Sequence, residues 1–247
     1  NSPNGGGGMR NAGASPTVTN CVFKDNVANY GGVPNSGGGM YNGDSDPILT
    51  DCVFENNSAV ENGGGVYNDG SSPTVQNCTF LNNSAEGNGG GMSSQDWSSP
   101  TLTNCSFQRN SAGFVGGGMY NLDHSHPTVT NSTFANNSGY PGNAIYTGGN
   151  TSAPTIGESV FCKNGNKHIY GFWNDKGGNC FADTCVECIP CPADFNEDGE
   201  VNVGDLLVLL EFWGTDGPGA DIAEPNDVVT VADLLGLLAA WGTCPYQ

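Results

Sequence analysis

The chain has 247 residues, with 39 Gly, 10 Cys and 6 Lys or Arg against 25 Asp or Glu, and its formal net charge is −19. So acidic a molecule is a poor partner for nucleic acid and for anionic membrane surfaces. No apolar run approaches the ~20 residues that span a bilayer. Ten cysteines indicate an oxidising environment, so we expect a secreted or cell-surface protein with no nucleic-acid partner and no membrane span.

A repeat dominates the first two thirds of the chain. The segment SPTVTNCVFKDN (15–26) recurs as DPILTDCVFENN (46–57), SPTVQNCTFLNN (72–83), SPTLTNCSFQRN (99–110), HPTVTNSTFANN (126–137) and APTIGESVFCKN (153–164). The first interval is 31 residues and the later ones are 26–27, because a loop insertion around 30–36 lengthens the first. A Gly-rich stretch such as GGGMYN precedes each copy. Fixed periods of this size are typical of solenoids.

Alternation of apolar and polar residues within each copy predicts short strands broken by turns. About three strands and three turns fit one period, which is one rung of a parallel β-helix. We therefore predict a mainly β fold, a right-handed parallel β-helix of about six to seven rungs over 1–176, followed by a small α-helical EF-hand-like domain.

Equivalent residues in successive rungs should stack ~4.8 Å apart. We expect a buried Phe column, a buried Met column and an Asn ladder at a turn that tolerates left-handed backbone. The ladder residues are Asn26, Asn57, Asn83, Asn110, Asn137 and Asn164. A fourth column holds Cys21, Cys52, Cys78 and Cys105, which Ser replaces in the last two copies. We interpret these thiols as mostly buried and unpaired, with bridges between adjacent rungs as the alternative.

The pairing of G-G-G-[MV] with F-x-x-N resembles the repeat of the chlamydial polymorphic membrane protein family and related bacterial surface β-helices, over residues 5–164. The resemblance implies a secreted surface protein that acts in adhesion and assembly.

The C-terminal part of the chain is more acidic than the repeat region. Residues 177–247 contain 13 Asp or Glu and no Lys or Arg. We predict a Cys-rich connector over 177–190 and a separate module over 191–247. Within that module NVGDLLVLLEFWGT (202–215) returns as TVADLLGLLAAWGT (230–243), which predicts two similar helices.

The run before the first helix has oxygen ligands at positions 1, 3, 5, 9 and 12 and Gly at position 6, the pattern of a Ca²⁺ loop. The predicted ligands are Asp194, Asn196, Asp198, Glu200 through its carbonyl, Asn202 and Asp205. The second loop is one residue longer and lacks the Gly, and its candidate ligands are Asp221, Asn226, Asp227 and Asp233.

Residues 191–244 resemble a type I dockerin, in the variant with Trp-Gly after each helix that is common in planctomycete-like secreted proteins. The resemblance implies Ca²⁺ as cofactor and a cohesin-like partner. Val203-Gly204 and Val231-Ala232 stand where dockerins often carry a Ser-Thr pair that selects the cohesin.

Six cysteines remain, for which we predict the disulfides Cys191–Cys244, Cys162–Cys180 and Cys185–Cys188. Connectivity is not determined by sequence, and a zinc site over 185–191 is the alternative. Sequons at Asn56, Asn82, Asn136 and Asn150 are candidate glycan acceptors.

Two hypotheses about function follow. The first is a secreted, non-catalytic assembly protein whose partner is a second copy, joined head to tail into filaments, or a cohesin-like or cell-surface protein, with glycans as further candidates. The second is a carbohydrate-active enzyme or a glycan-binding adhesin. An enzyme would use acids that follow the Gly-rich strand, with aromatic neighbours at Trp97, His124 and His126; these acids are Asp44, Asp69, Asp96 and Asp123. The alternative for the acids is a solvated corner of the solenoid.

Overall fold

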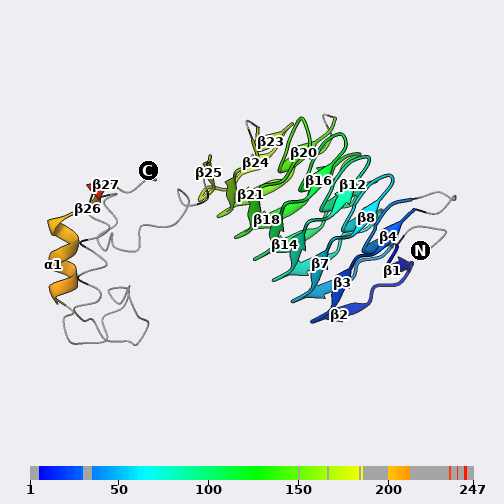
Figure 1. Ribbon diagram of the computed structural model, residues 1–247, viewed down its shortest axis with the longest axis horizontal. Coiled ribbons are helices and arrows are strands. Elements are labelled where there is room, and N and C mark those ends of the chain that lie inside the picture. The colour runs from blue at the N-terminus through cyan, green and yellow to red at the C-terminus, as the bar shows by residue number, and fades with distance from the viewer. Residues whose placement is uncertain are drawn as a thin grey trace. The chain divides into compact units, whose positions relative to one another are not determined.

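The computed structural model describes residues 6–29, 35–149, 151–165, 167–183, 185, 200–211, 234, 238 and 242–243. The chain divides into two compact units, Asn1–Cys185 and Val186–Gln247, which are treated separately below. The larger unit is a parallel β-solenoid, in which each coil repeats the same set of short strands and pairs with the coil before it (Figure 1).

Within the described residues, three seven-stranded parallel sheets form the solenoid wall. The first contains β1 (Met9–Ala12), β5 (Met40–Gly43), β9 (Val66–Asp69), β13 (Met92–Gln95), β17 (Met119–Asn121), β20 (Ile145–Thr147) and β23 (Ile169–Tyr170). The second contains β2 (Thr17–Thr19), β6 (Ile48–Thr50), β10 (Thr74–Gln76), β14 (Thr101–Thr103), β18 (Thr128–Thr130), β21 (Thr155–Gly157) and β24 (Asn174–Asp175). The third contains β3 (Val22–Lys24), β7 (Val53–Glu55), β11 (Thr79–Leu81), β15 (Ser106–Gln108), β19 (Thr133–Ala135), β22 (Val160–Cys162) and β25 (Cys180–Ala182).

The early coils carry a fourth strand that the sequence did not predict. It is two residues long and forms a four-stranded sheet from β4 (Val27–Ala28), β8 (Ser58–Ala59), β12 (Ser84–Ala85) and β16 (Ser111–Ala112). A pair of small residues has no alternation to detect, so the three-strand expectation was wrong for these coils. The predicted six to seven rungs are confirmed, with the seventh shorter than the rest.

Left-handed turns let each coil change direction between its strands. The residue before each ladder Asn has positive φ, as at Asn56 (φ 55°) and Asn82 (φ 53°), and so does the residue before each Cys or Ser of the thiol column. The ladder Asn residues themselves are not left-handed, which corrects our expectation. Asn and Asp adopt this conformation more readily than other non-glycine residues, so they recur at these turns.

The core is a set of columns that run along the solenoid axis. The rings of the Phe column are parallel within 7°, with centroids 4.3–5.0 Å apart, from Phe23 through Phe54, Phe80, Phe107 and Phe134 to Phe161. Two aliphatic columns pack beside it, and all their members are buried apart from partly buried Met9. They are the branched column of Val18, Leu49, Val75, Leu102, Val129 and Ile156, and the Met column of Met9, Met40, Val66, Met92, Met119 and Ile145. The predicted core is therefore confirmed.

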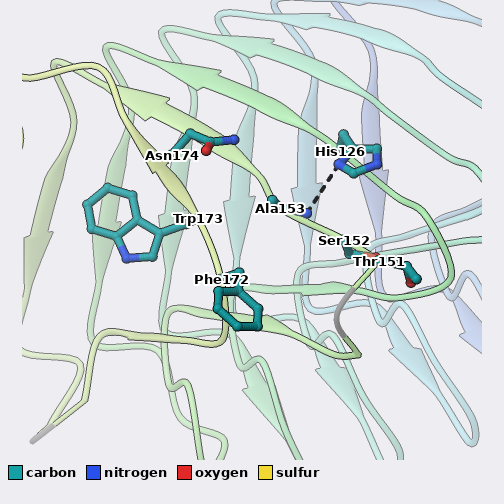
Figure 2. Close-up of a pocket in the computed structure, with 7 residues that line it drawn as sticks. All are labelled: His126, Thr151, Ser152, Ala153, Phe172, Trp173 and Asn174. Carbon is teal, nitrogen blue, oxygen red and sulfur yellow. Dashed lines mark hydrogen bonds between the residues drawn. The ribbon is translucent and has the colours of Figure 1, made fainter.

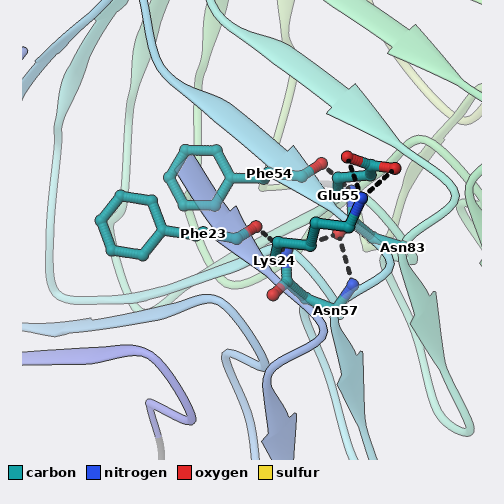
Figure 3. A network of polar contacts seen from close by, with 6 residues as sticks. All are labelled: Phe23, Lys24, Phe54, Glu55, Asn57 and Asn83. Atoms are coloured by element: carbon teal, nitrogen blue, oxygen red, sulfur yellow. Dashed lines mark hydrogen bonds and ion pairs between the residues drawn. The ribbon is translucent and has the colours of Figure 1, made fainter. Parts of the chain in front are cut away.

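The Asn ladder is also buried, apart from half-buried Asn26, and hydrogen bonds join each member to the next. In each step, the backbone N–H and Nδ2 of one Asn donate to Oδ1 of the Asn in the next coil, as from Asn57 to Asn83 (3.0 and 2.9 Å). The same Nδ2 also donates to the carbonyl of Phe23 in the preceding coil, at 2.8 Å. Figure 3 shows this network behind the exposed ion pair of Lys24 with Glu55, whose charged atoms are 3.0 Å apart.

The solenoid extends further than the predicted boundary at residue 176. Strand β25 pairs with β22, and Phe181 stacks on Phe161 at 4.9 Å. Part of the predicted connector 177–190 is therefore a solenoid strand.

Two predicted disulfides are wrong, because Cys162 bonds Cys185. The pairing of β22 with β25 places Cys162 opposite Ala182 and Cys180 opposite Val160. Cys185, three residues beyond Ala182, returns to within 4.9 Å of Cys162 between Cα atoms. Neither Cys162–Cys180 nor Cys185–Cys188 can then form; Cys180 is disulfide-bonded as well, and the predicted Cys191–Cys244 lies outside the described residues.

The described part of the smaller unit contains helix α1 (Val203–Glu211) and an antiparallel pair, β26 (Glu200–Val201) with β27 (Gly242–Thr243). The pair joins the residues just before the first helical repeat to the last residues of the second. In the described residues, no helix has the length and apolar character needed to cross a membrane.

The Phe column predicts a large and local stability effect. Phe107 is fully buried between two stacked rings, whereas Phe114 is 67% exposed. Phe107→Ala should lower the free energy of unfolding by about 3–5 kcal/mol, and Phe114→Ala should stay within ~0.5 kcal/mol of the wild type. Urea unfolding followed by circular dichroism measures both. Equal stability of the two variants would show that the inward face is misassigned.

Candidate functional site

The acidic residues that follow the first sheet lie at one corner of the solenoid. Asp44 and Asp96 come directly after β5 and β13, and Asp123 comes two residues after β17, each with φ near 50°. Asp69 is instead the last residue of β9, opposite Gly43 and Gln95 in the neighbouring coils. Asp69 is therefore offset by one residue from the column that the other three acids form.

This one-residue offset brings Asp69 into contact with Tyr41 and Asp96. The Tyr41 hydroxyl donates to Asp69 Oδ2 at 2.9 Å. Partial burial, a hydrogen bond with Asp69 and the negative charges of Asp69 and Asp123 together raise the pKa of Asp96. Burial and the hydrogen bond to Asp69 raise the pKa of Tyr41 to about 12. Asp96 therefore holds its proton more tightly than an isolated aspartate does.

An exposed aromatic pair lies next to these acids. Trp97 stacks on His124 in the next coil, with centroids 4.2 Å apart and planes within 6°. Both residues have positive φ, which turns their side chains outward after Asp96 and Asp123. His126 does not join them, because its Nδ1 accepts a hydrogen bond from the backbone N–H of Ala153.

A hydrolytic role for this corner would require a particular spacing of its carboxyl groups. Glycosidases hold their two carboxyl groups ~5–9.5 Å apart, with the scissile bond between them. Asp69 and Asp96 are the two acids of this corner that would have to meet that spacing. Over the described ranges, no cluster of three or more His, Cys, Asp or Glu side chains could hold a metal ion.

The thiol column is confirmed as unpaired. Cys52, Cys78 and Cys105 are buried and free, while Cys21 is free but exposed in the first coil. Burial raises the pKa of Cys78 to about 12 and that of Cys105 to about 11. Since the thiolate is the reactive form, these two side chains are inert at neutral pH and act as packing groups.

The predicted Ca²⁺ ligands are only partly within the described residues. Glu200 lies in β26, Asn202 precedes α1, and Asp205 lies in the first turn of α1. Asn202 Oδ1 accepts the backbone N–H of Gly204 at 2.7 Å. The other ligands lie outside the described residues: Asp194, Asn196, Asp198, Asp221, Asn226, Asp227 and Asp233.

The candidate glycan acceptors Asn56, Asn82 and Asn136 are exposed, each at a left-handed turn. Asn150 lies outside the described residues. Sequence reasoning missed a further feature, two adjoining pockets around Phe172 near the end of the solenoid. Phe172 falls after the last repeat copy, so the periodicity carried no signal for it.

The carboxyl pair predicts a pH-dependent change in stability. A folded-state pKa raised above the usual 3.8 means that Asp96 stabilises the fold at low pH, and that this contribution is lost as pH rises through the folded pKa. Asp96→Asn should therefore raise the melting temperature relative to wild type at pH 7 but not at pH 3.

Protein from a bacterial host should be used, because the change creates a sequon. Asp51→Asn is the control, since Asp51 is an exposed aspartate with a similar positive φ. If Asp96→Asn and Asp51→Asn shift the melting temperature equally at both pH values, the carboxyl pair is not coupled.

Comparison with known proteins agrees with the geometry. The family model for a right-handed β-helix region matches residues 1–124, half of the chain. No curated protein and no solved structure matches the chain. The matched residues cover the first four coils and part of the fifth, which contain all four Met residues and the first four members of the Phe column and of the Asn ladder. The chain belongs to the right-handed β-helix family.

Proposed function

We propose that the chain is a secreted, non-catalytic β-helix protein whose C-terminal, dockerin-like module binds Ca²⁺ and joins it to a protein partner in extracellular assembly. The observation that carries the proposal is an apolar face on α1. Val203, Leu207 and Leu210 are 61%, 64% and 48% exposed, whereas Leu209 is buried. Residues at this spacing share one side of a helix, and exposed apolar patches are typical of protein-binding surfaces.

Calcium fits the loop that precedes this helix. If Asp194 is loop position 1, α1 begins at position 10, so that Asp205 at position 12 lies in the first helical turn. Backbone N–H groups and the helix dipole favour a negative charge there. The ion would be held by Asp194, Asn196, Asp198, the Glu200 carbonyl, Asn202 and Asp205, and it would offset repulsion in a segment without Lys or Arg.

A second copy of the chain is the partner that the solenoid supports. Among the described residues, β1, β2, β3 and β4 each have a strand neighbour on one side only. A strand edge that is left unpaired offers backbone groups to another chain, and repeated contact of that kind would build head-to-tail filaments. Light scattering of the purified protein distinguishes the partners. A molecular mass that grows when Ca²⁺ is added indicates a second copy of the chain. A mass that stays that of the monomer leaves a cohesin-like or cell-surface protein as the partner.

A polysaccharide-active enzyme is the second candidate, favoured by the carboxyl pair of Asp69 and Asp96 beside the exposed ring of Trp97. A protonated and an ionised carboxyl are the groups that general acid–base catalysis needs. Incubation with a panel of polysaccharides decides between the two functions. New reducing ends or unsaturated products that disappear in Asp96→Asn would replace the non-catalytic proposal.

The calcium site makes a direct prediction. Because an ion that binds only the folded module stabilises it, calorimetry should show a transition that moves to lower temperature in excess chelator. Asp198→Ala should remove the effect of chelator. Asp216→Ala, which removes one negative charge of the same module between the two loops, should retain it. A wild-type profile that is identical with Ca²⁺ and with chelator would contradict the proposal.

A further inference from the structure

Two open pockets adjoin in the last coils of the solenoid, and Phe172 lines both. The first has a volume of about 490 Å³ and lies among His126, Ser152, Trp173 and Asn174 (Figure 2). The second has a volume of about 460 Å³ and is lined by Tyr146, Thr147, Lys167 and Tyr170. Each falls within the ~300–1,000 Å³ of typical small-molecule sites.

Aromatic rings provide the flat surfaces of this groove. The Phe172 side chain is 62% exposed between β23 and β24. Tyr146 and Tyr170 stack with centroids 5.2 Å apart and planes within 2°, and Lys167 lies over the Tyr170 ring at 4.3 Å. Trp173 is half-buried and packs against the core beneath, so the backbone that carries Phe172 is anchored. An exposed ring on an anchored segment is a preformed contact surface.

Polar groups surround the rings, and some have no partner in the fold. His126 Nδ1 accepts the Ala153 N–H at 3.2 Å, so the neutral ring carries its proton on Nε2. The Thr147 hydroxyl is buried, with 2% of the residue exposed, and makes no hydrogen bond within the described structure. Buried polar groups are normally paired. An unpaired hydroxyl in the wall of a pocket is therefore explained by a ligand or water with hydrogen-bonding groups.

We propose that this groove binds a neutral oligosaccharide, with one sugar on each side of Phe172. A pyranose presents C–H groups on its faces, which pack on an aromatic ring, and hydroxyls on its rim, which need both donors and acceptors. The residues lining the first pocket include no Asp, Glu, Lys or Arg. The chain's net charge of −19 disfavours acidic glycans. The inference does not depend on the calcium-binding module.

The test is calorimetric titration of the full chain with cellohexaose, xylohexaose and mannohexaose, and with a galacturonate hexamer as the anionic comparison. At least one neutral hexasaccharide should bind, and Phe172→Ala should weaken its binding at least tenfold. Phe114→Ala is the matched control, because Phe114 is 67% exposed and lines neither pocket; it should bind as the wild type does.

Three results would overturn the proposal: no heat with any neutral hexasaccharide at millimolar concentration, equal binding by Phe172→Ala and wild type, or tighter binding of the galacturonate hexamer than of every neutral sugar. Because Phe172 is exposed, its replacement by Ala should change the stability of the fold little. A melting temperature equal to that of Phe114→Ala verifies this for the protein used.

Discussion

The fold depends on hydrogen bonds between buried asparagines of successive coils. The side chain of each interior member makes four: Oδ1 accepts two from the Asn before it, and Nδ2 donates to the Asn after it and to a Phe carbonyl. An amide without these partners would cost about 1–3 kcal/mol for each buried group left unpaired. The ladder therefore enforces one register, and every coil must present its Asn at the same height and angle.

That register explains the surface as well as the core. Once the coils are locked, side chains that point outward from equivalent positions lie about one strand spacing apart, ~4.8 Å. Stacking is then favourable for rings, as for Trp97 on His124, and unfavourable for like charges, as for Asp69 near Asp96. The corner at coils three to five follows from the fold and needs no ligand to account for it.

The ladder ends where the pockets begin. Asn164 is its last member, and its Nδ2 lies 3.4 Å from Nδ1 of His168 instead of another amide. Burial lowers the pKa of that imidazole, which favours its neutral form. A second internal ladder, from Asn11 through Asn42 and Asn68, ends at Ser94, and the next positions, Asn121 and Thr147, are left without partners. Thr147, which lies beyond the end of this second ladder, lines one of the pockets around Phe172.

Periodicity explains which parts of this structure could be predicted. Residues repeated six times, such as the Phe and Asn columns, revealed the fold and the core because each copy is evidence for the others. Departures from the repeat carried no such support: the position of Asp69, the partner of Cys162 and the groove at Phe172 each depend on one local geometry. The calcium loops were recognised by spacing within a single segment, which predicts ligands but not a partner.

The most direct test of this account is the free energy of unfolding of Asn110→Ala, measured in urea beside Asn88→Ala. Both amides bond an Asn in a neighbouring coil, but Asn88 is only half-buried. Loss of the Asn110 amide removes the acceptor of the Asn83 N–H and a donor to the Phe80 carbonyl inside the solenoid. We predict that Asn110→Ala loses at least about 2 kcal/mol more than Asn88→Ala. Equal losses in the two variants would contradict the claim that the buried ladder holds the coils in register.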